Sequence, residues 1–244
     1  MKNIKDICFV VQARMGSQRV PRKMLKPFAG TTLVDILLDK LKQSNVIPLD
    51  NVYFSCYEDE LKDVAHKHGV NIFHRSRESA FGENDMQTIF EWHDKLPFKY
   101  VVLISACNPL LTINTINSFT EKFISSDKLG GFAVFEKKTY YWDKDGNNIT
   151  DWQNNPIMNT KFVEPIYEAA HCLYASQLDM IKDGFWMDRD YPPCPELFVM
   201  NELEAFDIDH SWQFEVAESL YLQDEPQNTN DLKNLFSTTK YNKV

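Results

Sequence analysis

The first half of the chain alternates short, fully apolar runs with longer segments whose apolar residues recur every three or four positions. Residues 7–11 are apolar throughout, which is typical of a parallel strand covered on both faces. Residues 31–44 carry leucine and isoleucine at helical spacing and predict a helix with one buried face. The same pattern predicts strands at 51–56, 70–73, 100–104 and 131–135, and helices at 58–68, 85–96 and 111–123. This alternation predicts an α/β fold with a mostly parallel sheet, helices on both faces and the most apolar strand, 100–104, at its centre.

The alternation stops near residue 137. Residues 137–165 are polar and aromatic around a turn cluster, which fits a hairpin excursion, a subunit-contact arm or an exposed loop insertion. The elements predicted after it are strand 169–174, helix 176–183 ending at Gly184, a strand end at 205–209 and helix 211–222. The pattern therefore predicts one domain over residues 1–223 with an insertion at 137–165, followed by a polar tail at 224–244.

The composition is that of an ordinary globular protein, with 43% hydrophobic and 25% charged residues among 244. No apolar run approaches the roughly 20 residues that cross a bilayer, and the first residues lack a signal-peptide core, so we expect no membrane partner. The 26 basic and 35 acidic residues give a net charge of −9, which argues against a general nucleic-acid binder. Five cysteines without a CxxC pair indicate reduced, mostly buried thiols of a cytoplasmic protein and no zinc site.

A basic loop directly after the first strand reverses the overall charge. The first thirty residues hold seven basic side chains against one acid, and five of the seven lie between Arg14 and Lys26. Ligands bind at the carboxyl edge of open α/β sheets, where this loop starts, and Gly16 and Ser17 allow the backbone to approach an anion closely. The loop matches neither a Walker A nor a GxGxxG motif. It predicts a polyphosphate site, against the alternative of a solvated basic loop.

The loop also resembles a family signature. Residues 13–30 read Ala-Arg-x-Gly-Ser-x-Arg-x-Pro-x-Lys-x-Leu-Lys-Pro-x-x-Gly, which is similar to the signature of the cytidylyltransferases that make CMP-activated acidic sugars. Those are the acylneuraminate, legionaminate, pseudaminate and Kdo cytidylyltransferases. The sequence of residues 12–17 is most similar to the spore-coat-polysaccharide branch of this family. Weaker similarity extends to about Gln223. The resemblance implies a single Rossmann-like nucleotidyltransferase domain that transfers CMP from CTP to a hydroxyl of an acidic sugar, for surface polysaccharide biosynthesis.

The resemblance assigns roles to single residues of the loop. Arg14 and Lys23 match the family's triphosphate-binding arginine and lysine, and Ser17 matches a loop residue near the phosphates. The full set of predicted nucleotide-binding residues is Ala13, Arg14, Gly16, Ser17, Arg19, Lys23 and Arg75.

Arg75 is assigned through a second segment, 74–80. It matches an arginine beside the nucleotide base in the family's Arg-Pro-x-x-Leu-Ala segment, although Ser76 and Ser79 stand where the family has proline and leucine. Without the resemblance, Arg75 is as readily interpreted as a surface arginine.

Two acids near the end of the predicted domain form the second candidate site. Asp207 and Asp209 are two positions apart, so on a strand they face the same way and repel unless a cation lies between them. Mg²⁺ supplies such a cation and bridges to phosphate oxygens, whereas two solvated acids are the alternative. The family's Asp-Ile-Asp motif implies a Mg²⁺ cofactor here. The family commonly has a further aspartate where this chain has Gln213, so the number of metal ions stays open.

The acceptor side departs further from the family. The chain has Ser-Ala-Cys-Asn-Pro-Leu at 105–110 where many relatives have Gln-x-Thr-Ser-Pro-Leu, and Ala-His-Cys-Leu-Tyr at 170–174 where they have Asn-Gly-x-x-Tyr. Ser105, Asn108 and His171 are the candidate acceptor contacts, with a buried core histidine as the alternative for His171. A nucleophilic role for the cysteine of the first segment lacks a base spaced to serve it.

The resemblance implies in-line attack of the acceptor hydroxyl on the α-phosphate of CTP, with pyrophosphate leaving. Arg14, Lys23 and the Mg²⁺ ligand Asp209 are then the predicted catalytic residues. Two alternatives remain: the same chemistry on another acceptor, such as a phosphonate or another acidic sugar, and an inactive nucleotide-binding module. The family also implies a homodimer through residues 137–165. The aromatic residues there agree equally with a contact surface and with local packing: Tyr140, Tyr141, Trp142, Trp152 and Phe162.

Overall fold

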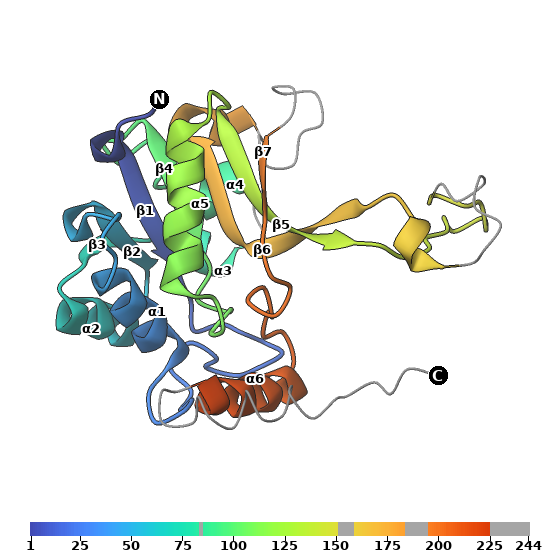
Figure 1. The fold of residues 1–244 in the computed structure, drawn as a ribbon. Helices are drawn as coiled ribbons and strands as arrows, with labels where there is room; N and C mark the ends of the chain where they lie inside the picture. Colours follow the sequence, from blue (N-terminus) through green and yellow to red (C-terminus); the bar gives the residue numbers. More distant parts are fainter. Residues whose placement is uncertain (83–84, 151–158, 184–194, 225–244) are drawn as a thin grey trace.

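The computed structural model describes residues 1–82, 85–150, 159–183 and 195–224, which form a seven-stranded sheet in the order β3-β2-β1-β4-β6-β5-β7 (Figure 1). The strands are β1 Ile7–Gln12, β2 Val52–Cys56, β3 Asn71–His74, β4 Tyr100–Ile104, β5 Gly130–Lys137, β6 Ile166–Gln177 and β7 Glu196–Val199. The α-helices are α1 Leu33–Lys42, α2 Asp59–His68, α3 Arg77–Phe81, α4 Met86–Ile89, α5 Ile113–Ser125 and α6 Ser211–Asp224. The short 3-10 helices are η1 Ile4–Asp6, η2 Leu49–Asn51, η3 Thr160–Phe162 and η4 Leu178–Asp183.

One half of the sheet is entirely parallel. Strands β3, β2, β1 and β4 run the same way, with Gln12 beside Ser55 and Val11 beside Ile104 at the carboxyl ends. The predicted α/β fold is confirmed, and β4 is the middle strand of the seven, as its apolar sequence predicts. Because β1 and β4 end at one edge, the loops that follow them start next to each other.

The other half of the sheet contains the strand that runs against the rest. Strand β6 is antiparallel to both β4 and β5, while β7 is parallel to β5. The chain turns back between β5 and β6, and the two strands extend together beyond the sheet as a long hairpin arm (Figure 1). The pairing of β5 with β6 shifts register between Phe132 and Val134, which marks a bulge near the site described below.

Both faces of the sheet are covered. Alternate residues of β1 face opposite sides: Ile7, Phe9 and Val11 pack with apolar residues of α1, α2 and α5. On the other face, Cys8 and Val10 pack against a cluster that includes the fully buried Trp92 and residues of η4. No helix in the described part of the chain is long and apolar enough to cross a bilayer.

Two helix predictions are wrong, and tertiary packing explains both. The helix predicted at 85–96 is reduced to α4, because the chain turns after it and the Trp92 ring enters the core beside Phe90. The helix predicted at 176–183 is replaced by the end of β6 and by η4, whose Met180 and Ile181 are buried. In both segments the apolar residues are buried in the core, but the packing there does not allow an α-helix along the whole segment. Gly184 lies outside the described residues.

The predicted strand end at 205–209 is also wrong, since residues 206–209 have no regular secondary structure. Ile208 is nevertheless fully buried, in a small cluster with Phe28 and Phe214, and the aspartates on either side of it are partly exposed. Strand β7 was not predicted, because its four residues are too short for a clear alternation. The polar tail at 225–244 lies outside the described residues.

Candidate nucleotide-binding site

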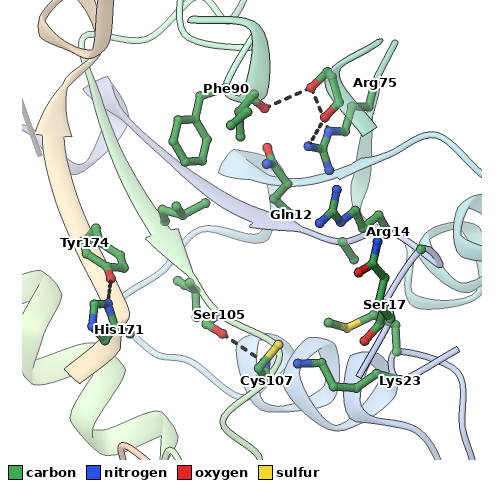
Figure 2. A pocket seen from close by; sticks show the side chains of 18 of the residues that line it. Gln12, Arg14, Ser17, Lys23, Arg75, Phe90, Ser105, Cys107, His171 and Tyr174 are labelled. Atoms are coloured by element: carbon green, nitrogen blue, oxygen red, sulfur yellow. Dashed lines mark hydrogen bonds between the residues drawn. The ribbon is translucent and has the colours of Figure 1, made fainter. Parts of the chain in front are cut away.

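A cavity of about 740 Å³ opens at the carboxyl edge of β1 and β4. Its lining comes from the loop after β1, from the start of the loop after β4, from the segment around α3 and α4, and from β6 (Figure 2). The position agrees with the rule that ligands bind at this edge of an open α/β sheet. Of the predicted residues, the cavity is lined by Ala13, Arg14, Gly16, Ser17, Arg19, Lys23, Arg75, Ser105 and His171.

The basic loop divides into residues that line the cavity and residues that point elsewhere. Arg14, Arg19 and Lys23 line it. Arg22 instead pairs with Glu60 of α2 at 2.9 Å, both side chains being more than half exposed. Lys26 lies over the Phe214 ring of α6 at 4.3 Å. Three of the five basic side chains of the loop therefore contribute positive charge to the cavity, in addition to Arg75.

The backbone of the loop is held at both ends. The Ala13 N–H donates to the carbonyl of Ser55, and the Met15 N–H donates to the carboxylate of Glu58 at 2.8 Å. Further along, the Ala29 N–H donates to Glu218 of α6 at 2.7 Å. A Cβ atom on Gly16 would stand 3.3 Å from the Phe81 ring, which is tighter than ordinary contact. The loop is therefore shaped before any ligand binds.

Lys23 joins the basic loop to the distant acidic segment. Its side chain is buried, and its ammonium group donates to the carbonyl of Ile208, between the two aspartates. Arg19 forms an ion pair with Asp209 at 2.6 Å, where both side chains remain partly exposed. Residues almost two hundred positions apart thus meet at one end of the cavity. Neither Asp207 nor Asp209 is among the lining residues, but Asp207 is close enough to interact electrostatically with Lys23 and Cys107.

Asp207 has the properties of a cation ligand. Its Oδ1 atom is buried and has no hydrogen-bond partner among the described residues. Burial raises the pKa of Asp207, the charge of Asp209 adds to that effect, and the charges of Lys23 and His171 oppose it. A buried carboxylate oxygen without a donor fits a divalent cation. No cluster of three or more His, Cys, Asp or Glu side chains suited to a metal occurs in the described part of the chain. A cation held by Asp207 and Asp209 would take its remaining ligands from substrate oxygens and water.

Gln213, which stands where the family commonly has an aspartate, supports the same segment. Its side-chain oxygen accepts hydrogen bonds from the backbone N–H groups of Asp209, at 2.8 Å, and His210, at 2.7 Å. These are donors at the start of α6 that otherwise lack partners within the helix. Gln213 therefore fixes the backbone of the acidic segment.

Arg75 lies at the opposite end of the cavity and is buried. Its Nε donates to Ser79 Oγ at 2.8 Å, and that hydroxyl donates to the carbonyl of Ile89 at 3.0 Å. Burial, with the positive charge of Arg14 in second place, lowers the pKa of Arg75 to about 10. Arg14 itself donates to the carbonyl of Ala80 at 3.0 Å. The alternative interpretation of Arg75 as a surface arginine is wrong.

The three predicted acceptor contacts separate in the structure. Ser105 and His171 line the cavity, but Asn108 is buried and donates through Nδ2 to the carbonyl of Ala205 at 3.0 Å. Asn108 thus secures the segment that leads to Asp207, together with the bond from the Ile208 N–H to the Cys107 carbonyl at 3.1 Å. Burial raises the pKa of Cys107, which does not favour a nucleophilic thiolate.

His171 is exposed rather than buried in the core, so the alternative of a core histidine is wrong. Its Nδ1 atom lies 2.6 Å from the hydroxyl of Tyr174, which also lines the cavity (Figure 2). Its φ of 52° is in the left-handed region, and the resembling family pattern has glycine at this position. The bulge in β6 turns the imidazole toward the cavity while the backbone retains a glycine-like conformation.

Among the lining residues that sequence reasoning missed, three have side chains suited to contact a ligand: Gln12, Phe90 and Tyr174. Gln12 is the polar residue that ends an otherwise apolar strand, which is a usable signal. Phe90 gave no signal, because it lay inside a predicted helix. Tyr174 matches the tyrosine of the family pattern at 170–174, but that match says nothing about the side it faces.

A protein-family model described as Cytidylyltransferase matches residues 8–162. The pseudaminic acid cytidylyltransferase of Campylobacter jejuni subsp. jejuni serotype O:23/36 (strain 81-176) is 23% identical over 233 residues, covering 89% of this chain and 97% of that protein. The spore coat polysaccharide biosynthesis protein SpsF of Bacillus subtilis (strain 168) is 36% identical over 81 residues, covering 31% of this chain and 34% of that protein.

Solved structures show the same fold. A CMP:2-keto-3-deoxy-manno-octonic acid synthetase complexed with CTP has a TM-score of 0.65 at 11% identity, over 89% of this chain and 98% of that one. A 4-diphosphocytidyl-2C-methyl-D-erythritol synthase from Anaerococcus prevotii DSM 20548 has a TM-score of 0.63 at 15% identity, over 89% and 96% of the two chains.

Proposed function

The chain belongs to the cytidylyltransferase family, and from that premise we propose that it transfers CMP from CTP to a hydroxyl of an acidic sugar and releases pyrophosphate. The observation that carries the proposal is the meeting of Lys23 with Ile208 and of Arg19 with Asp209. Through these contacts, basic and acidic groups from the two ends of the domain lie at one mouth of one cavity. That is the arrangement a metal-bound triphosphate requires.

The chemical task of the site is to position the substrates and neutralise charge. Arg14 and Lys23 line the cavity and would offset the charge that builds on pyrophosphate as it leaves. The Gly16–Ser17 backbone would approach the phosphate oxygens closely. Asp207 and Asp209 would hold Mg²⁺, which when bound supplies charge neutralisation at the α-phosphate and lowers the pKa of the attacking hydroxyl. Our assignment of this ion rests on the unpartnered Oδ1 of Asp207.

Ser105, His171 and Tyr174 form the wall that would face the acceptor. The relatives that match most of the chain act on pseudaminic acid, according to their names, which supports an acidic sugar of that kind as acceptor. The chain has Ser105 and Cys107 where the family usually has glutamine and threonine. This difference favours a second candidate function, which is the same CMP transfer to a different acidic acceptor such as a phosphonate.

We also propose a cytoplasmic homodimer that associates through the arm. Trp142 is 51% exposed, Phe162 61% and Tyr167 43%, and a partner subunit seated on the arm would bury these aromatic side chains. Trp152 lies outside the described residues. Four free cysteines in the described part of the chain agree with a reducing compartment. Sedimentation of the full chain as a monomer at micromolar concentration would exclude the dimer.

The test combines nucleotide binding with turnover. Thermal shifts with CTP, UTP, ATP and GTP, each with and without Mg²⁺, should give the largest rise in Tm for CTP with Mg²⁺, because a bound ligand stabilises the folded state. Pyrophosphate release is then measured across pseudaminic, sialic and other acidic sugars and phosphonates. Turnover on an acidic sugar supports the proposal. Tight CTP binding without turnover on any acceptor would support a non-catalytic nucleotide-binding protein instead.

A further inference from the structure

We propose that Gln12, held in one orientation by Trp92, selects cytosine over uracil at the base end of the cavity. The inference rests on the proposed function, since it requires a nucleotide in the cavity. It adds a specificity determinant that the sequence analysis did not identify.

Two buried residues next to the Gln12 side chain set the orientation of its amide. Trp92 is fully buried, and its indole Nε1 donates to Gln12 Oε1 at 2.7 Å. The hydroxyl of Ser55, also fully buried, lies 3.5 Å from the same oxygen. An indole N–H can only donate, so the atom it contacts must be the amide oxygen. The amide nitrogen is therefore left to face the other way.

This arrangement removes the usual ambiguity of a glutamine. A free glutamine side chain rotates its amide and offers either a donor or an acceptor to a ligand. Here rotation would place the Gln12 NH₂ group against the indole N–H of the buried Trp92 and leave that N–H without its acceptor. The structure thus presents a fixed donor to whatever occupies this end of the cavity.

The shape of this end suits a flat base. Figure 2 shows the Gln12 amide between Phe90 and Arg75, at the end of the cavity away from Lys23 and Cys107. Phe90, Ile89 and Leu103 supply apolar lining there. Arg14 lies between this end and the phosphate end, so a nucleotide whose triphosphate meets Lys23 would extend its base toward Gln12.

The two pyrimidines differ at the atom that such a donor would read. Position N3 of cytosine accepts a hydrogen bond, whereas N3 of uracil carries a hydrogen and donates. A fixed N–H group therefore satisfies cytosine and opposes uracil with a second donor. Sites that discriminate by hydrogen bonding reject the wrong partner strongly, because a buried polar group is then unpaired.

The decisive variant is Gln12→Glu. One carboxylate oxygen can still accept from Trp92, while the other offers an acceptor in place of the amide donor. We expect the ratio of kcat/KM for CTP to that for UTP to fall at least about tenfold, the factor that one mismatched hydrogen bond produces. Gln43→Glu, at the exposed end of α1, makes the same charge change away from the cavity and should leave the ratio unchanged.

Trp92→Phe provides an independent test through the positioning residue. It removes the donor that fixes the amide and keeps an aromatic ring in the core. The CTP-to-UTP ratio should fall because Gln12 can then rotate, and Tm measured alongside separates this effect from a loss of stability. If Gln12→Glu fails to fold, this variant decides the question.

The outcomes separate the inference from the function on which it rests. A folded Gln12→Glu or Trp92→Phe variant with an unchanged CTP-to-UTP ratio overturns the role of Gln12 and leaves the cytidylyltransferase proposal intact. A wild-type protein that neither binds CTP nor releases pyrophosphate overturns both.

Discussion

The two halves of the sheet supply opposite walls of the cavity, and they are built differently. The wall from the parallel half is held by hydrogen bonds: Arg75 by Ser79, Gln12 by Trp92 and Lys23 by Ile208. The wall from β6 contains a bulge and an exposed His171 with a left-handed backbone. The difference indicates a nucleotide wall that is organised before binding and an acceptor wall that can vary with the substrate.

Strand geometry explains why the parallel half supplies the ordered nucleotide wall and β6 the variable acceptor wall. In the parallel half, side chains at the strand ends emerge in register, so Gln12, Ser55 and Ile104 keep regular positions. In β6 the shifted register redirects single side chains without disturbing the rest of the sheet. A family can therefore keep its nucleotide chemistry while it changes residues 105–108 and 170–174.

Lys23→Ala breaks the nucleotide wall and should have the largest effect. Turnover should fall by roughly 10²–10³-fold, which is the scale for losing one group that stabilises charge in the transition state. Continuous pyrophosphate release at saturating acceptor measures this loss. Lys26→Ala is the matched control, because Lys26 lies over the Phe214 ring and not in the cavity. Full activity of the Lys23→Ala variant would show that Lys23 does not stabilise the leaving pyrophosphate and would contradict the assignment of the site.

His171→Gly tests the acceptor wall alone. It removes the imidazole, and glycine adopts the φ of 52° without strain, so Tm should change little. We expect the KM for the acceptor to rise about tenfold, as for the loss of one hydrogen bond, with an unchanged KM for CTP. A change confined to the KM for CTP would place His171 in the nucleotide site and contradict the division into two walls.

Asp35→Asn concerns the scaffold under the nucleotide wall and should leave kcat unchanged. Burial on its own raises the pKa of Asp35, but hydrogen bonds from His68, Lys67 and Thr32 outweigh it and lower the pKa to about 2. The variant should lose about 1–2 kcal/mol of unfolding free energy at pH 7, a figure reduced because Lys67 is exposed.

The sign of the pH dependence follows from the lowered pKa of Asp35. The contribution is fully present above the unfolded pKa of about 3.9 and is lost as the pH falls through the folded value near 2. Urea unfolding at several pH values should show the gap between wild type and variant narrowing below pH 4. Asp63→Asn, at an exposed position of α2, is the control. A gap that widens on acidification would contradict the assignment.

Much of the fold could be predicted from the sequence because its strands in the first half are continuous apolar runs. The same pattern failed at 85–96 and 176–183, where Trp92 in a turn and Ile181 in the short 3-10 helix η4 fill the second face of the sheet. No local pattern records which distant residues a tryptophan will contact. Periodicity alone therefore could not find these turns.

The loop residues of the candidate site were identifiable because charge, glycine and position coincide at 13–23. Asn108 shows the limit of motif reasoning: its motif predicts an acceptor contact, yet its side chain is buried against Ala205. Gln12 shows the opposite case. Its place at a strand end was visible, but its orientation depends on Trp92, eighty positions away.

The central claim is that Lys23 and Asp207 act on the same triphosphate. Calorimetric titration of CTP in the presence of Mg²⁺ tests it directly, with wild type, Lys23→Ala, Asp207→Asn and the double variant. If both residues act on one ligand, each single substitution raises the Kd for CTP. The fold-increase in the double variant should then be smaller than the product of the two single fold-increases. Wild-type affinity for CTP in either single variant would show that this residue does not act on the triphosphate and would contradict the account.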